Sequence, residues 1–141
     1  DVYKRQTQAV VGAFADVIGM DFDTAVRFSS GFGGGMGRLR EVCGTFSGAV
    51  IVVNALYGYS DPKNIQAKAE LYSRIQELAA QFRRDNGSII CKELLGLSRP
   101  EGSPIPEART DEYYKKRPCP ELCRYSANML EEYIREHPPV K

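Results

Sequence analysis

The chain has 141 residues, of which 43% are hydrophobic and 26% are charged, a composition typical of one soluble globular domain. A formal net charge of +1 provides no basic field for nucleic acid or for an anionic membrane surface. The longest apolar run, around residues 49–57, is far shorter than the roughly 20 residues of a membrane-spanning helix. We therefore expect a cytoplasmic protein that neither binds nucleic acid nor spans a membrane.

The chain begins with an unusual hexapeptide, DVYKRQ, over residues 1–6. It matches the translation of a transposon-end adapter used in sequencing libraries, so we interpret these residues as an artefact. Residues 7–141 are then expected to form a single helical domain. On this interpretation the natural N-terminus is missing, so the sequence does not decide whether an export signal precedes Thr7.

Apolar side chains recur at helical spacing along most of the chain, and only the ambiguous stretch 88–91 resembles a β-strand. The stretch 39–57 is apolar on all sides, which predicts a central, buried helix. Prolines and charged residues over 98–118 predict one long irregular surface loop. We expect an all-α fold, a compact bundle of about five helices around the central one. The other predicted helices cover 6–18, ended by Gly19; a short segment around 25–28 capped by Asp21 or Asp23; 65–82, after Ser60-Asp61-Pro62 and before Asn86-Gly87; 89–95, after Ser88; and the stretch from Pro120 to Pro138.

A glycine cluster over 31–37 precedes the central helix. Glycine-rich turns before a helix can bind phosphate, but this one has Met36 where the dinucleotide pattern needs glycine. It also lacks the Gly-Lys-Ser/Thr of a P-loop. We interpret the cluster as a connector with positive φ angles that lets helices approach closely. Arg38 and Arg40 keep an anion site open as the alternative.

Four cysteines carry the chemical interest of the sequence. Cys91, in the first turn of a predicted short helix, and Cys119, at a predicted N-cap, occupy positions where a helix favours the reactive thiolate. Cys123 is one turn after Cys119, so this pair could share a metal or exchange a disulfide. Cys43 lies in the apolar stripe of the central helix. Gly44 and Gly48 leave space beside the Cys43 sulfur, where a cofactor could bind.

Other catalytic templates are missing. His137 is the only histidine, and it lies close to the C-terminus among prolines, where we expect it to be solvated. A serine or cysteine triad therefore has no candidate base.

The segment Cys43-Gly44-Thr45-Phe46-Ser47-Gly48 resembles the central motif of the C_GCAxxG_C_C family of small redox-active proteins. The family pattern has four cysteines: one ahead of Gln-Ala-Val, one in Cys-Gly-Ala-x-x-Gly, one before a Glu-Leu-Leu-Gly-like segment and one at the start of the last helix. Cys43, Cys91 and Cys119 match the last three. The glycine run is also similar, so the resemblance covers nearly the whole chain.

The chain departs from the family pattern at three positions. Gln6, the last residue of the suspected artefact, stands where the first cysteine belongs. Thr45 replaces the alanine of the motif, and Cys123 is an additional cysteine.

The resemblance implies that cysteines from four helices converge on the central helix for a redox or metal-binding role. In one mechanism, Cys43, Cys91 and Cys119 exchange thiols and disulfides with an unidentified redox partner. In the other, these three, with the lost first cysteine or with Cys123, ligate an iron–sulfur cluster or zinc. We favour thiol exchange because no Cys-x-x-Cys pair is present to organise a metal.

A helical interaction module, in which the cysteines only pack, is the competing class of function. The resemblance also implies a link to membrane transporters, because genes of the family often neighbour transporter genes. A homo-oligomeric state is a further possibility that the sequence leaves open.

Overall fold

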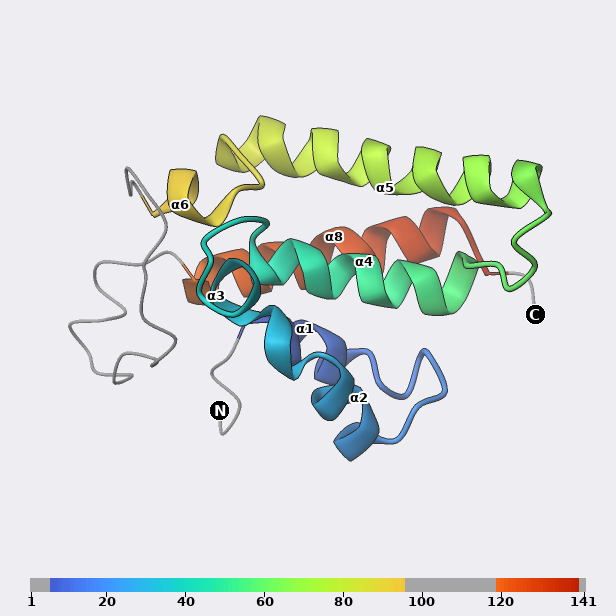
Figure 1. Ribbon diagram of the computed structural model, residues 1–141, viewed down its shortest axis with the longest axis horizontal. Helices are drawn as coiled ribbons and strands as arrows, with labels where there is room; N and C mark the ends of the chain where they lie inside the picture. The colour runs from blue at the N-terminus through green and yellow to red at the C-terminus, as the bar shows by residue number, and fades with distance from the viewer. Residues whose placement is uncertain (1–5, 96–118, 140–141) are drawn as a thin grey trace.

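The computed structural model describes residues 6–95 and 119–139, with the side chains of Gln6 and Cys119 excepted. In this part of the chain all the regular elements are helical, which confirms the predicted all-α fold (Figure 1). The helices are α1 (Gln6–Ala13), α2 (Phe22–Phe28), the 3-10 turn η1 (Ser30–Phe32), α3 (Gly33–Met36), α4 (Gly44–Tyr57), α5 (Ile65–Asn86), α6 (Cys91–Leu94) and α8 (Cys119–Glu136).

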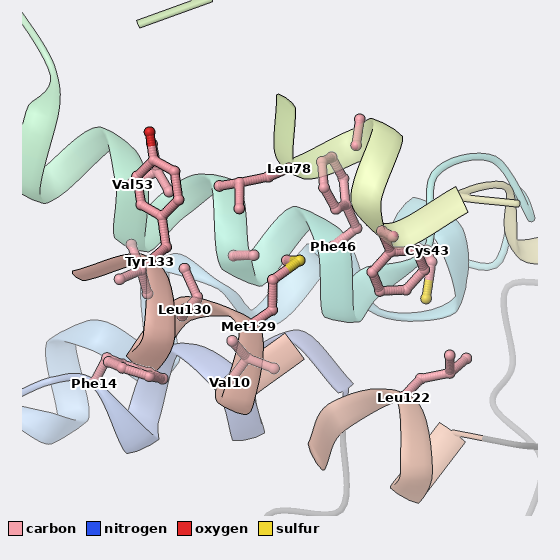
Figure 2. Packing of buried hydrophobic residues seen from close by; sticks show 14 of the residues in the cluster. Val10, Phe14, Cys43, Phe46, Val53, Leu78, Leu122, Met129, Leu130 and Tyr133 are labelled. Carbon is pink, nitrogen blue, oxygen red and sulfur yellow. The ribbon is translucent and has the colours of Figure 1, made fainter. Parts of the chain in front are cut away.

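Helix α4 is the centre of the bundle, as its apolar sequence predicts. It contacts α1, α5 and α8, and Figure 1 shows α5 on one side of it and the α1–α2 pair on the other. Phe46, Val52 and Val53 of α4 are buried in one core cluster with side chains from α1, α5 and α8 (Figure 2). No helix in the described ranges is long and apolar enough to cross a membrane. The predicted loop over 98–118 lies outside the described residues.

Helix α1 is shorter than the predicted stretch 6–18. The regular helix ends at Ala13, and the chain continues in turns as far as Gly19, where φ is +72°. Within these turns the Ala15 carbonyl accepts a hydrogen bond from Met20, five residues later, at 3.0 Å. Phe14 and Ala15 are nevertheless buried. The apolar spacing therefore predicts which side chains are buried here, but not the backbone hydrogen bonds.

The central helix begins five residues later than predicted. Residues 39–43 precede α4 instead of belonging to it, and Cys43 is the N-cap of that helix rather than a member of its apolar stripe. The reason is a tertiary contact: Val42 forms an isolated antiparallel β-bridge with Ile90. The same bridge shortens the predicted helix 89–95 to α6, with Ile90 as its N-cap in place of Ser88.

The long helix α5 matches its predicted course, although its cap differs. The side chain of Asn64, rather than that of Ser60 or Asp61, accepts a hydrogen bond from the Ala67 N–H at 3.0 Å. At the other end the chain leaves the helix at Gly87, where φ is +94°.

The glycine cluster forms a left-handed turn, which confirms the predicted positive φ angles. Five successive residues, 34–38, have φ between +56° and +72°, and two of them, Met36 and Arg38, are not glycine. Gly35 is indispensable to the close approach of the following chain. A Cβ built there would lie 2.6 Å from the Glu41 backbone nitrogen, which donates a hydrogen bond to the Gly35 carbonyl.

Aromatic side chains close the opposite end of the bundle. Tyr57 at the end of α4 packs edge to face against Tyr133 of α8, and the Arg74 guanidinium of α5 lies 4.2 Å from the Tyr57 ring centre. His137 stacks on Tyr133 with a centroid distance of 4.2 Å, so its ring is packed against a neighbour rather than simply solvated. The Tyr57 hydroxyl donates to the His137 carbonyl at 2.6 Å.

We expect Gly35→Ala to lower the free energy of unfolding by at least about 2 kcal/mol. The backbone at residue 35 is left-handed, and a side chain there would collide with backbone atoms of Arg40 and Glu41. Urea unfolding followed by circular dichroism measures the change. Gly31→Ala is the matched control, since a Cβ at Gly31 meets nothing within 4 Å and its φ is not positive. Equal losses in the two variants would contradict the role assigned to Gly35.

Candidate functional site

Four positions of interest lie at the starts of four helices. Three are cysteines, and the fourth is Gln6, which stands where the resembled family pattern has its first cysteine. Cys43 immediately precedes α4, Cys91 is the first residue of α6, Cys119 is the first residue of α8, and Gln6 is the first residue of α1. These four helix starts lie toward the same end of the molecule, on the left in Figure 1.

Two buried hydroxyl groups tie the helices together at this end. The Thr7 hydroxyl of α1 donates to the Gly44 carbonyl at 2.8 Å, and the Ser126 hydroxyl of α8 donates to the Thr45 carbonyl at 3.0 Å. Both acceptors belong to the first turn of α4 and therefore follow Cys43 directly. The first turn of α4 is consequently held from two sides.

The β-bridge brings Cys43 and Cys91 close together although they are 48 residues apart in sequence. Its two hydrogen bonds run from the Cys43 N–H to the Ile89 carbonyl at 2.7 Å and from the Cys91 N–H to the Glu41 carbonyl at 2.5 Å. In this pattern the two cysteines are diagonal neighbours on one face, since side chains alternate on either side of the bridged pair. Diagonal Cα atoms are ordinarily about 7–8 Å apart, beyond the reach of an unstrained disulfide.

Cys43 is a buried thiol in a polar contact. Its side chain is 1% exposed, and its sulfur lies 3.1 Å from the Thr45 hydroxyl oxygen. Burial raises the pKa of this thiol, because the charged form loses its hydration. Hydrogen bonds from Thr45 and from the Phe46 backbone act in the opposite direction, and the Cys91 thiol adds a small increase. Figure 2 shows Cys43 at one end of the buried cluster, near Phe46.

Cys91 lies beside a buried cation. It is 2% exposed, and one guanidinium nitrogen of Arg40 lies 3.7 Å from its sulfur. Arg40 itself is only 3% exposed, and its φ is +61°. An arginine side chain keeps its charge at all ordinary pH values, so a permanent positive charge faces this sulfur.

The two glycines predicted to leave room for a cofactor take part in packing. Gly44 is buried in the first turn of α4, where its carbonyl accepts the Thr7 hydrogen bond. A Cβ at Gly48 would lie 3.0 Å from the Cβ of Val10 and 3.2 Å from the Thr7 carbonyl, so Gly48 allows α1 and α4 to approach closely. A cofactor-binding role for Gly44 and Gly48 stays a prediction.

The remaining cysteines are both on α8. Cys123 is half-buried, and the side chain of Cys119 lies outside the described part of the chain. Among the described residues, no group of three or more histidine, cysteine or carboxylate side chains is arranged to hold a metal. The metal site predicted from Cys43, Cys91, Cys119 and Cys123 therefore stays a prediction.

Sequence reasoning missed the neighbours of the two thiols. It considered Arg40 only as an anion ligand, and it treated Thr45 as a mild replacement. The only available signal for Thr45 was its hydroxyl two residues after a cysteine. Arg40 had no local signal, because its contact with Cys91 spans 51 residues.

Comparison with protein families matches residues 7–133 to the family described as "Putative redox-active protein (C_GCAxxG_C_C)". The chain belongs to this family. The match covers all three family cysteines recognised in the sequence. Comparisons with curated proteins and with solved structures found no match.

For this C_GCAxxG_C_C protein, we expect Cys43 to reduce stability at alkaline pH. Its raised pKa in the folded state means that the unfolded chain releases the thiol proton first. The Cys43 contribution is thus complete below the pKa of the unfolded chain and is lost as the pH rises through the folded pKa. Urea unfolding between neutral and alkaline pH measures the slope, which should become shallower in Cys43→Ala.

Cys123→Ala is the control for this measurement, because Cys123 is only half-buried and the variant keeps Cys43. It should retain the slope of the unchanged protein. If Cys43→Ala also retained it, the pKa of Cys43 would not differ between the folded and unfolded states.

Proposed function

We propose that this protein exchanges thiols and disulfides, with Cys91 as the attacking thiol and Cys43 as the thiol that completes the reaction. The observation that carries the proposal is the Val42–Ile90 bridge, which holds two buried family cysteines on one face with the Arg40 charge against one of them. Family membership supports a redox role in general terms.

The proposed reaction transfers two electrons to a disulfide in a redox partner. The Cys91 thiolate attacks one sulfur of that disulfide, which breaks the partner's S–S bond, forms a mixed disulfide and releases one partner thiolate. Cys43 then loses its proton and attacks the Cys91 sulfur, which forms the Cys43–Cys91 disulfide and releases the second partner thiolate. The two protons of the dithiol end on the two partner thiols, so atoms and electrons balance.

The second step requires the two segments to move. The Cα atoms of diagonal neighbours across a β-bridge are ordinarily up to about 1 Å farther apart than the usual limit for a disulfide. Two backbone hydrogen bonds, from Cys43 and Cys91 themselves, form this bridge, and one more, from the Lys92 N–H to the Arg40 carbonyl, links the same two segments. A small displacement there is therefore the conformational change that the proposal needs.

A metal-ligating role has weaker support from the described residues. Cys43 and Cys91 supply two neighbouring thiols, fewer than the four ligands of a structural zinc site or a four-cysteine cluster. Thiol exchange is also compatible with a cytoplasmic location, where cysteines are kept reduced.

Treatment with glutathione disulfide, followed by acid quenching, alkylation and peptide mass spectrometry, tests the proposal. We expect a cross-link between the peptides of Cys43 and Cys91, formed intramolecularly and reversed by dithiothreitol. Cys43→Ser should accumulate glutathione on Cys91, because the mixed disulfide can no longer be resolved. Cys91→Ser should greatly slow oxidation of Cys43, whose burial raises its pKa.

Cys123→Ser is the control, and it should form the same cross-link at the same rate. Absence of the cross-link in the unchanged protein would overturn the assignment of the pair. Stoichiometric iron or zinc in Gln6→Cys protein purified without oxygen, with the thiols protected from alkylation, would replace thiol exchange by metal ligation.

A further inference from the structure

We propose that Arg40 determines which of the two thiols attacks: its buried guanidinium stabilises the thiolate of Cys91 and holds that sulfur in place. This inference rests on the proposed thiol exchange and names the residue that positions and activates its first step. Arg40 acts through Cys91 and is therefore a positioning residue.

The backbone of Arg40 is fixed from two directions. Its N–H donates to the Gly34 carbonyl at 3.1 Å, inside the left-handed turn, and its carbonyl accepts from the Lys92 N–H at 3.1 Å, inside α6. The neighbouring residue Glu41 is bonded in the same way, to Gly35 and to Cys91. Arg40 thus joins the glycine turn directly to the helix that carries the thiol.

The same turn provides room for the guanidinium. A Cβ at Gly34 would lie 3.6 Å from a terminal nitrogen of Arg40 and 3.1 Å from the Cγ of Arg38. The arginine side chain therefore passes close over the Gly34 backbone on its way to the Cys91 sulfur. The positive φ of Arg40 is unfavourable in an L-residue, and the surrounding hydrogen bonds compensate for it.

The two thiols differ in the charge beside them. A buried cation at 3.7 Å lowers the energy of a thiolate strongly, because the surrounding protein screens the interaction far less than water does. The Cys43 sulfur instead lies 3.1 Å from the neutral hydroxyl of Thr45. The asymmetry assigns attack to Cys91 and the later step to Cys43.

Cys43, Lys92 and Glu93 are further titratable groups close to Cys91 in the part of the chain that the structure describes. Cys43 is uncharged as a thiol, and Lys92 and Glu93 are both on α6, next to Cys91 in the chain. The Glu93 carboxylate accepts a hydrogen bond from the Ser88 hydroxyl at 2.8 Å. Glu41 contacts Cys91 through its backbone carbonyl.

The pH dependence of alkylation of each cysteine tests the inference. Iodoacetamide labelling is followed by mass spectrometry of the individual peptides, and the pH midpoint for each thiol is the readout, because burial limits reagent access at every pH. In Arg40→Met we expect the Cys91 midpoint to rise by at least about one pH unit, and its rate at neutral pH to fall at least about tenfold. The midpoint of Cys123 should not change.

Arg40→Lys is the matched variant, because it keeps a positive charge of similar reach and the same left-handed backbone requirement. In Arg40→Lys the pH midpoint of Cys91 alkylation should lie closer to that of the unchanged protein than to that of Arg40→Met. Circular dichroism and urea unfolding identify folded variants, and a variant that unfolds is replaced by Arg40→Gln under the same criteria.

The outcomes separate the inference from the proposed function. An unchanged Cys91 midpoint in folded Arg40→Met, with the Cys43–Cys91 cross-link still formed in the unchanged protein, would overturn the role of Arg40 alone. Equal increases in Arg40→Met and Arg40→Lys would also overturn it, since the charge would then not be the cause. No cross-link in the unchanged protein would instead remove the proposed function on which the inference rests.

Discussion

One short β-bridge determines the arrangement of the candidate site. The pairing of Val42 with Ile90 links a segment before α4 to a segment before α6, and it uses the backbone groups of both cysteines. A single contact of this kind provides little stability by itself, because an isolated pair of strands is marginal in water. It persists because the flanking helices α4 and α5 and the glycine turn fix the two segments from outside. The position of each thiol is therefore a property of the whole bundle.

The glycine turn is the most unusual part of this support. Left-handed backbone at Met36, Arg38 and Arg40 costs free energy at each residue, and such conformations persist only where the surroundings over-determine them. Here the hydrogen bonds from Arg40 and Glu41 to Gly34 and Gly35 provide the compensation. Strain is thus concentrated next to a buried cation and a buried thiol, whereas the long helices α5 and α8 are regular.

The fold could be predicted from the sequence where side-chain spacing decides the structure. Helix α5 and the central position of α4 follow from apolar periodicity, since burial of one face or of all faces leaves a direct pattern. The start of α4 could not be predicted in this way, because residues 39–43 have helical spacing but form hydrogen bonds with the distant segment 89–92. Cys43 and Cys91 could be recognised by resemblance. The proximity of these two cysteines and the approach of Arg40 depend on contacts between residues about 50 positions apart in the sequence, which no local pattern encodes.

The aromatic cluster at the far end gives the bundle two ends of different character. Tyr57, Tyr133 and Arg74 connect α4, α8 and α5 about 20 Å along α4 from Cys43, since each helical residue adds about 1.5 Å. Such a clamp keeps the three long helices aligned when contacts at the cysteine end are broken. Local opening around the thiols then costs less free energy than global unfolding, so amide hydrogens near the β-bridge exchange with solvent before those in the middle of α5. The fold in this way combines a stable helical scaffold with a cysteine-bearing end that can open on its own.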